Sequence, residues 1–213
     1  MLFKINMAKR AYSPREILKM TYKPIPWDGE WERCFGQPDM YDTWFISGPS
    51  AGGKSSFVMQ LAKKLCEYGV VLYCSYEEKV SMSFKDRIER FHMEEEQGRF
   101  RVCTDSDIDN LKRMLKQRKG PKFIIVDSFQ LSHWEYAQVE ALVDEFPRKS
   151  FIFISQEAKS QPLGKPAVRL KFMAGVKVRV VGYEAVCQGR YISEPGAMFE
   201  VWEDGLIQTS NNI

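Results

Sequence analysis

Short apolar runs alternate with amphipathic stretches along most of the chain. Five runs are nearly all apolar and are bounded by polar or turn-forming residues: 44–47, 70–75, 100–103, 123–126 and 151–154. Runs of this kind are typical of strands buried on both faces of a parallel sheet. The stretches between them carry apolar residues at helical spacing, which we interpret as faces packed against that sheet. These stripes contain Val80, Phe84, Ile88 and Phe91, then Ile108, Leu111 and Leu115, and then Val139, Leu142, Val143 and Phe146. The alternation predicts a three-layer α/β domain with right-handed crossovers between the strands.

The two ends of the chain follow other patterns. Ser13-Pro14-Arg15-Glu16 is a capping box with proline at the first helical position, which predicts a short helix ending at about Met20. Residues 22–31 are rich in proline and glycine, so we expect an irregular segment there. Beyond Leu170, the segments 176–181, 185–187 and 198–202 are separated by glycines and predict an antiparallel ribbon that closes the sheet edge. We therefore expect a leader over residues 1–39 and a core over residues 40–213.

A glycine-rich loop joins the first apolar run to the first helical pattern. It reads Gly-Pro-Ser-Ala-Gly-Gly-Lys-Ser, a complete G-x-x-x-x-G-K-S motif. The backbone NH groups of such a loop and the start of the following helix bind the β-phosphate of a nucleotide, which we take to be ATP. Lys54 can reach the β- and γ-oxygens, and the Ser55 hydroxyl completes an Mg²⁺ shell. The expected nucleotide-binding residues are Gly48, Pro49, Ser50, Ala51, Gly52, Gly53, Lys54, Ser55 and Ser56.

Polar side chains follow three of the later apolar runs. Asp127 ends one run and would hold Mg²⁺ through the water shell of the ion. Glu77 and Glu78 follow another, where one of them could orient or deprotonate the attacking water; we choose Glu77, with Glu78 as its rival and a solvated acidic loop as the alternative. Gln156 follows a third run and could sense the γ-phosphate, although an ordinary loop glutamine explains it as well. These residues are the candidates for catalysis.

Composition narrows the class of protein only slightly. With 213 residues, 44% of them hydrophobic, the chain can bury one sizeable core. A net charge of +3 is too small to indicate a nucleic-acid partner by itself. The scattered cysteines lack a C-x-x-C pair and the two histidines lack metal-ligand spacing, which favours reduced thiols and no zinc site. No apolar stretch has the length of a membrane span or a signal peptide, so we expect a cytoplasmic protein.

In combination, these motifs resemble the core of the RecA-like ATPases. The segments that carry the resemblance are 48–55, 72–78, 86–91, 125–131 and 154–156, within roughly residues 40–207. The branches most similar to them are the bacterial RadA/Sms repair ATPases and the motor domain of DnaB-type replicative helicases. The run from Tyr73 to Glu78 is similar to the Y-V-S-G-E-E-S of RadA, and the run from Asp127 to Leu131 to the helicase D-Y-L-Q-L. The resemblance implies a P-loop NTPase fold with a mostly parallel sheet, ATP hydrolysis and oligomeric assembly.

The resemblance also implies how the site is built. The strand of Gln156 should separate the phosphate-loop strand from the strand of Asp127. That order would gather four side chains around one γ-phosphate: Lys54, Glu77, Asp127 and Gln156.

Neighbouring subunits of such motors complete one another's sites with a Lys-x-Arg on the terminal hairpin. Arg190 matches the arginine, whereas Cys187 or Gln188 stands where the lysine is expected. We therefore expect Arg190 to act in trans on a neighbour's nucleotide within a homo-oligomeric ring or filament. A surface hairpin arginine is the alternative.

A basic segment directly follows Gln156. Between Ala158 and Tyr183 the chain has no acidic residue, and its loop-like first part, residues 160–166, corresponds to the DNA-contacting loop of the RecA-like family. The expected DNA contacts are Lys159, Lys165, Arg169 and Lys171. Binding of this kind is independent of sequence, sensitive to salt and suited to single strands. A second basic stretch, residues 112–122, has helical spacing and is interpreted as a solvated helix face; an ordinary basic patch is the alternative for the first stretch too.

Three functions compete for this sequence. The leading hypothesis is a cytoplasmic, Mg²⁺-dependent RecA-like ATPase that forms a ring or filament and acts on DNA in recombination, repair or replication. The rival is a KaiC-like regulatory or scaffold ATPase, whose output is ATP-dependent oligomerisation without DNA. A small-molecule phosphotransferase is disfavoured, because the chain has no arginine-rich lid segment.

Overall fold

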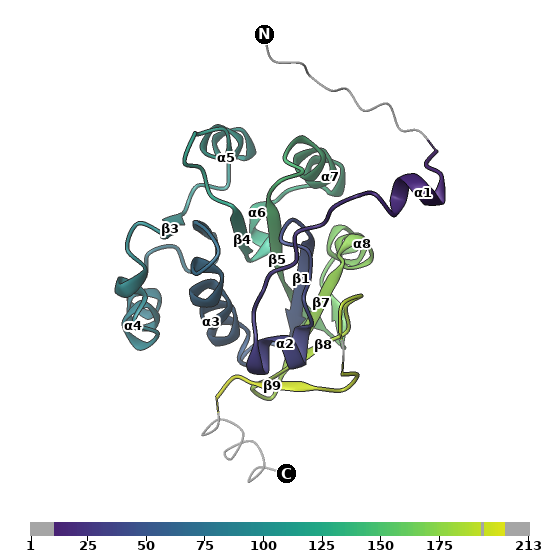
Figure 1. The fold of residues 1–213 in the computed structure, drawn as a ribbon. Coiled ribbons are helices and arrows are strands. Elements are labelled where there is room, and N and C mark those ends of the chain that lie inside the picture. Colours follow the sequence, from purple (N-terminus) through teal and green to yellow (C-terminus); the bar gives the residue numbers. More distant parts are fainter. Residues whose placement is uncertain (1–10, 193, 203–213) are drawn as a thin grey trace.

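One central sheet covered by helices makes up the described part of the chain (Figure 1). The computed structural model describes residues 11–192 and 194–202. Residues 1–10 of the predicted leader, and residues 193 and 203–213 of the predicted core, lie outside the described residues. The described strands are β1 (Thr43–Gly48), β2 (Val71–Ser75), β3 (Phe100–Cys103), β4 (Phe123–Asp127), β5 (Ser150–Ala158), β6 (Gln161–Pro162), β7 (Val176–Val181), β8 (Glu184–Cys187) and β9 (Met198–Glu200).

The strand order agrees with the sequence-based expectation. The strands follow the order β3-β2-β4-β5-β1-β7-β8-β9, and β6 pairs with β5. From β3 to β7 the neighbours pair in parallel, whereas β8 and β9 add antiparallel pairs at the edge. This confirms the mostly parallel sheet with an antiparallel C-terminal ribbon, and it confirms that β5 separates β1 from β4.

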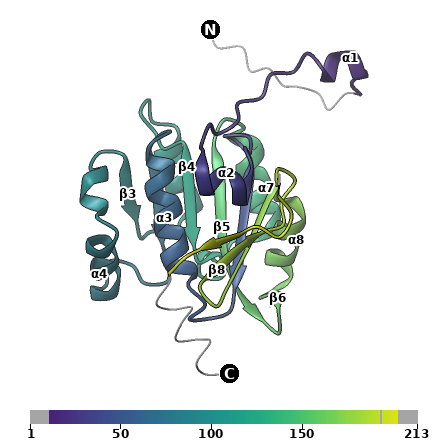
Figure 2. The same ribbon diagram turned by 60° about the horizontal axis from the view of Figure 1, so that its bottom comes forward.

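Helices cover both faces of the sheet, as Figures 1 and 2 show. The described helices are α1 (Pro14–Ile17), α2 (Gly29–Phe35), α3 (Lys54–Cys66), α4 (Met82–Arg90), the 3₁₀ turn η1 (Met93–Glu96), α5 (Ile108–Leu115), α6 (Phe129–Ser132), α7 (Tyr136–Glu145) and α8 (Lys165–Met173). Helices α2, α3 and α4 pack on one face, and α5, α6, α7 and α8 on the other. None of the helices in the described part of the chain is both long enough and apolar enough to cross a membrane.

Alternate residues of each central strand enter the two cores. In β1, Trp44 and Ile46 pack with α3, while Phe45 between them packs on the opposite side of the sheet. The same division holds in β2, β4 and β5, because successive side chains of a strand point to opposite faces. It explains why the sequence shows continuous apolar runs at these strands.

Three residues depart from the predicted burial pattern: Val80, Arg101 and Val102. The prediction that all five runs are buried on both faces is wrong for β3, where Arg101 and Val102 are exposed because β3 is the edge strand and, among the described strands, pairs with β2 alone. Val80 does not join the predicted helical stripe, since it precedes α4 and is exposed. Helix α4 faces the core through Phe84, with Ile88 packed beside it.

The leader differs from its prediction in two places. The capping box of α1 is present, but the helix ends at Ile17 instead of Met20. Residues 29–31, predicted to be irregular, open α2, which is held by aromatic packing of Trp31 and Phe35 against Phe57. Burial of these rings outweighs the local preference of a glycine-containing segment. Residues 25–35 thus add to the core formed by β1 and α3, and the predicted boundary at residue 39 stays a prediction.

Candidate functional site

The glycine-rich loop links the end of β1 to the start of α3. Its backbone enters the left-handed region at Ala51 and Gly53, with φ of 58° and 94°. A Cβ on Gly48 would lie 2.0 Å from the carbonyl oxygen of Val180, so only glycine fits there. The Tyr183 amide donates a hydrogen bond of 3.2 Å to the Gly52 carbonyl oxygen. The loop therefore rests on the turn between β7 and β8 as well as opening a helix.

Lys54 is the first residue of α3 and folds back over the loop. Its ammonium group donates a hydrogen bond of 2.5 Å to the Pro49 carbonyl oxygen. Burial lowers the pKa of Lys54, and the carboxylates of Glu77, Asp127 and Glu157 oppose that shift. The first turn of a helix leaves amide groups unpaired, so the loop offers an anion both these amides and an ammonium group.

Polar side chains from four segments line one cavity of about 230 Å³ next to the loop. Its walls are Ser50, Ala51, Lys54, Ser55, Glu77, Glu78, Asp127, Ser128, Ile154, Ser155 and Gln156. The candidates come together because the carboxyl ends of β1, β2, β4 and β5 meet at one edge of the sheet. The structure thus brings together Lys54, Ser55, Glu77, Asp127 and Gln156, as the sequence analysis expects.

Asp127 is held by the strand beside it. The hydroxyl of the buried Tyr73 donates a hydrogen bond to Asp127 Oδ2. Burial raises the pKa of Asp127 to about 6; the Tyr73 hydrogen bond acts against this, and the nearby Glu77 adds to it. The backbone amide of Tyr76 also donates to the Asp127 carbonyl oxygen, at 2.7 Å. These contacts fix the carboxylate at the floor of the cavity.

Glu77 and Glu78 have different partners. The side-chain amide of Gln156 donates to Glu77 Oε1 at 3.1 Å. The guanidinium of Arg87 donates to Glu78 Oε1 at 2.8 Å, in an ion pair of which only 14% of the Arg87 side chain is exposed. Glu77 is exposed to the cavity and Glu78 is engaged with α4, so the two neighbouring carboxylates are not equivalent.

The oxygen atoms of this cavity fit a hydrated Mg²⁺. In residues 11–192 and 194–202, no group of three or more His, Cys, Asp or Glu side chains is arranged to hold a metal by itself. Mg²⁺ usually keeps several waters and binds one or two carboxylates together with phosphate oxygens. The Ser55 hydroxyl and the Asp127 carboxylate line the cavity, and Ser128 Oγ beside them is buried without a hydrogen-bond partner. An ion shared with a nucleotide matches this donor set.

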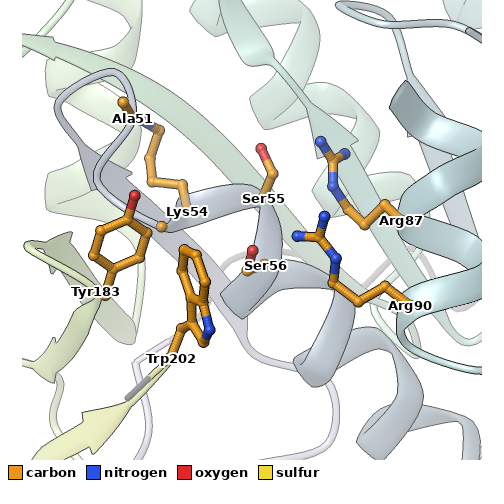
Figure 3. A pocket seen from close by; sticks show the side chains of 9 residues that line it. Ala51, Lys54, Ser55, Ser56, Arg87, Arg90, Tyr183 and Trp202 are labelled. Atoms are coloured by element: carbon orange, nitrogen blue, oxygen red, sulfur yellow. The ribbon is translucent and has the colours of Figure 1, made fainter. Parts of the chain in front are cut away.

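A second cavity, of about 240 Å³, lies beside the start of α3 (Figure 3). It shares Ala51, Lys54 and Ser55 with the first and is completed by Gly53, Ser56, Arg87, Arg90, Tyr183 and Trp202. Arg87 and Arg90 come from α4 and lie across the helix start from the two aromatic rings (Figure 3). The rings of Tyr183 and Trp202 pack edge to face with centroids 5.2 Å apart. The cavity therefore places flat and cationic groups beside the phosphate loop.

Four residues of this second cavity are not among the site residues predicted from the sequence: Arg87, Arg90, Tyr183 and Trp202. The sequence signal for the two arginines was the run 86–91 within the resemblance, which contains both Arg87 and Arg90. Tyr183 and Trp202 reach the loop from the C-terminal ribbon, and no local pattern marks them.

Arg190 lies at the opposite end of the ribbon from the phosphate loop. Its amide donates a hydrogen bond of 3.0 Å to the carbonyl oxygen of Gly175, the residue before β7. Tyr183, which contacts the loop, follows the other end of β7, and a strand of this length spans roughly 20 Å. Arg190 is therefore remote from the loop of its own chain, and its predicted action in trans stays a prediction.

The basic segment differs from the predicted loop. Lys159 lies in the tight turn between β5 and β6, but Lys165, Arg169 and Lys171 lie on α8. The helix forms because Pro166 suits its first turn and because Ala167 and Leu170 are buried against the sheet. The predicted loop is thus short, and most of its cations are carried by a helix.

Two further cations of this segment lie on β7. Arg179 forms an ion pair with Glu157, with Nε 3.0 Å from Oε2 and only 2% of the Glu157 side chain exposed. Glu157 also accepts a hydrogen bond of 2.8 Å from Ser47 Oγ on β1. Arg179 is therefore part of the structure that holds β1, β5 and β7 together. Lys177 lies on the same face of β7, and both cations alternate with the buried Val176, Val178 and Val180.

Comparisons with known proteins identify the fold. No model of a protein family matches the chain, and no curated protein sequence matches it. Among solved structures, it is similar to the flagellar accessory protein FlaH from Methanocaldococcus jannaschii, with a TM-score of 0.61, 15% identity and coverage of 84% of this chain and 93% of that one. It is also similar to a KaiC-like protein from Pyrococcus horikoshii OT3, with a TM-score of 0.59, 16% identity and coverage of 83% and 92%. A third similar structure is an ATPase domain, with a TM-score of 0.57, 13% identity and coverage of 79% and 84%. Together with the strand order and the loop that follows β1, these similarities show that the chain has the RecA-like P-loop fold.

Proposed function

We propose that the chain is a cytoplasmic ATPase that requires Mg²⁺, assembles as a homo-oligomeric ring or filament, and acts on DNA. The observation that carries the catalytic part is the cavity in which Lys54, Glu77 and Gln156 surround the space next to the phosphate loop. An ATP whose β-phosphate sits on the loop amides would direct its γ-phosphate into that cavity.

Each polar side chain then has a distinct task. Lys54 holds the β- and γ-oxygens, while Ser55 and Asp127 hold Mg²⁺, Asp127 through water. Bound Mg²⁺ neutralises charge on the phosphate oxygens. Glu77 orients the attacking water and accepts its proton as the new bond to the γ-phosphorus forms and the bond to the β–γ bridging oxygen breaks. The products are ADP and inorganic phosphate.

The second cavity is suited to the nucleoside part of ATP. Tyr183 and Trp202 offer aromatic faces, and Arg90 offers a cation opposite them. A purine ring gains from stacking on flat side chains and from contact with a guanidinium group. We infer that adenine lies in this cavity while its phosphates lie on the loop.

Titration calorimetry tests the nucleotide assignment. The wild-type chain should bind ADP, and ATP with Mg²⁺, whereas Lys54→Ala should lose most of the ATP affinity. Trp202→Ala should weaken ADP binding by about tenfold, a loss of one stacking contact, and Tyr183→Phe, which keeps the ring, serves as the control. No binding of either nucleotide by the wild-type chain would reject the proposal.

The assignment to DNA rests on the position of the basic side chains. Lys159 follows β5 by one residue, and Lys165 begins α8 close to the same strand end as Gln156. Nucleotide-dependent movement at Gln156 can thus reach cations that bind a phosphate backbone. Stimulation of ATP hydrolysis by single-stranded DNA at low salt would support this assignment.

A KaiC-like regulatory or scaffold ATPase remains the second candidate. One of the similar structures is described as KaiC-like, and this chain has Cys187 and Gln188 where a DNA motor is expected to carry the finger lysine. ATP-dependent assembly, seen by light scattering, without any stimulation by DNA would favour this candidate over the first.

A further inference from the structure

A third cavity lies between the starts of α7 and α8. It has a volume of about 440 Å³ and is lined by Glu135, Tyr136, Ala137, Lys165, Pro166 and Arg169. The tyrosine ring and Pro166 give it flat apolar walls, and two cations stand at its side. None of these residues belongs to the two cavities at the phosphate loop.

The tyrosine and the arginine of this cavity are already arranged as a pair. The Arg169 guanidinium lies 5.6 Å from the centroid of the Tyr136 ring, within cation–π distance. The Tyr136 hydroxyl donates a long hydrogen bond of 3.4 Å to Glu140 on the same helix. Two planar groups from different helices therefore meet in the wall of the cavity.

The exposed side of α8 also carries cationic and aromatic side chains. Lys165, Arg169 and Phe172 are spaced at i, i+4 and i+7, which places them along one side of the helix. Phe172 is 76% exposed, while Ala167 and Leu170 of the same helix are buried. An aromatic ring left in water beside two cations indicates a binding surface more than a packing face.

This surface is tied to the strand that carries Gln156. The Gln130 side-chain amide donates to Ser155 Oγ at 2.8 Å and to the Leu163 carbonyl oxygen at 2.9 Å. The side-chain oxygen of Gln130 accepts a hydrogen bond of 3.3 Å from the backbone amide of Gln156. Leu163 lies two residues before α8, so one glutamine joins the candidate γ-phosphate sensor to the start of the exposed helix.

We propose that the α8 surface, defined as Tyr136, Lys165, Arg169 and Phe172, binds single-stranded nucleic acid by stacking unpaired bases on its aromatic rings. This rests on the proposed action on DNA and specifies its contacts. Phosphates contact Lys165 and Arg169, and bases stack on Phe172 and on the Tyr136–Arg169 pair. The partner is argued from charge, because the stretch from Ala158 to Tyr183 carries Lys165, Arg169 and Lys171 without an acidic residue, and Glu135 is the one carboxylate among the residues that line the cavity.

Fluorescence anisotropy with a labelled oligothymidylate of about 20 nucleotides tests the stacking. Phe172→Ala and Tyr136→Leu should each weaken binding by about tenfold and leave the slope of log affinity against log salt unchanged. Lys165→Ala should instead reduce that slope by about 0.7, because it removes one phosphate contact. Phe172→Trp should retain the affinity, and its indole fluorescence should be quenched when the oligonucleotide binds.

Matched controls separate the α8 surface from charge in general. Lys119→Ala removes an exposed cation from the other basic stretch. This variant should not reproduce the loss of oligonucleotide affinity that is expected for Phe172→Ala. Unchanged ADP affinity shows that each variant is folded. Full affinity in both Phe172→Ala and Tyr136→Leu, while wild type binds the oligonucleotide, overturns the stacking surface alone.

Two other outcomes would contradict the stacking surface for different reasons. If wild type hydrolyses ATP but binds no oligonucleotide, the proposed action on DNA fails and the stacking surface fails with it. If Phe172→Ala dissociates an oligomer in sedimentation while DNA affinity is unchanged, the surface contacts a second copy of the chain and the inference is wrong.

Discussion

The side-chain amide of Gln156 and the carboxylate of Glu77 form a 3.1 Å hydrogen bond across the candidate γ-phosphate cavity. The two residues lie at the ends of β5 and β2, which are separated in the sheet by β4. A γ-phosphate entering between them would exchange this contact for its own oxygens. The pair therefore connects the proposed base with the proposed sensor.

Replacing Glu77 tests the role of the base. Glu77→Gln should lower kcat for ATP hydrolysis by about 100-fold or more, while ATP affinity is retained, because only proton transfer is lost. Phosphate release and nucleotide titration measure the two quantities. Glu78→Gln is the matched control: it changes the adjacent carboxylate, which pairs with Arg87, and should keep hydrolysis. If hydrolysis is lost in Glu78→Gln and kept in Glu77→Gln, Glu78 is the catalytic base and Glu77 is not.

The raised pKa of Asp127 predicts how the stability of the nucleotide-free protein depends on pH. Its pKa is about 6 in the folded chain and 3.8 in the reference state, so folding favours the protonated carboxyl. The stabilisation from this group is fully present below pH 4 and is lost as pH rises through about 6. The shift corresponds to about 3 kcal/mol.

Urea unfolding at several pH values measures this contribution. Asp127→Asn cannot ionise, so the difference in free energy of unfolding between Asn and Asp should grow between pH 4 and pH 6 and then level off. Other carboxylates titrate equally in both proteins and cancel in the difference. A difference that does not vary with pH contradicts the assignment.

The support of the phosphate loop predicts opposite effects for two substitutions. Gly48→Ala would place its Cβ 2.0 Å from the Val180 carbonyl oxygen, and it should destabilise the fold by about 1–3 kcal/mol and weaken ADP binding. Ala51→Gly relieves a residue with φ of 58° and should be neutral or stabilising by up to about 1 kcal/mol. Chemical denaturation of the two variants compares them; equal destabilisation would mean that the contact with β7 is unimportant.

Mixed oligomers test the proposed role of Arg190. Arg190→Ala and Lys54→Ala subunits should each be nearly inactive alone, and mixing them should restore part of the ATP hydrolysis, because some interfaces then combine an intact loop with an intact arginine. Restoration should depend on the ratio of the two subunits. Two inactive variants that stay inactive at every ratio argue against a shared site.

The phosphate loop and the strands beside it could be predicted from the sequence because their determinants are local, whereas the position of β5 between β1 and β4 was implied only by the family resemblance. Residues 48–55 specify the loop by themselves, and each strand beside it is a continuous apolar run ending in a polar residue. Strand ends that share one sheet edge then bring Asp127 and Gln156 to the loop.

Features that depend on contacts distant in sequence could not be predicted in this way. Trp202 joins Arg90 only because the C-terminal ribbon folds back beside α4. The start of α2 contains a glycine, and its helical conformation depends on rings contributed by Phe57 and Trp44. The loop-like reading of Lys165 failed because the turn residues Gly164 and Pro166 lie at the beginning of α8, where they also suit a helix start.

The ribbon strand β7 touches the phosphate loop at one end, through Val180 and Tyr183, and carries the Arg190 region at the other. A hydrogen-bonded strand transmits displacement along its length with little stretching. In an assembled oligomer, a neighbouring subunit that displaces the Arg190 end of β7 would thus also shift the other end of β7, which contacts the phosphate loop of the displaced subunit. Through β7, nucleotide binding at one site of the oligomer would affect the phosphate loop of the next site without a separate mobile domain.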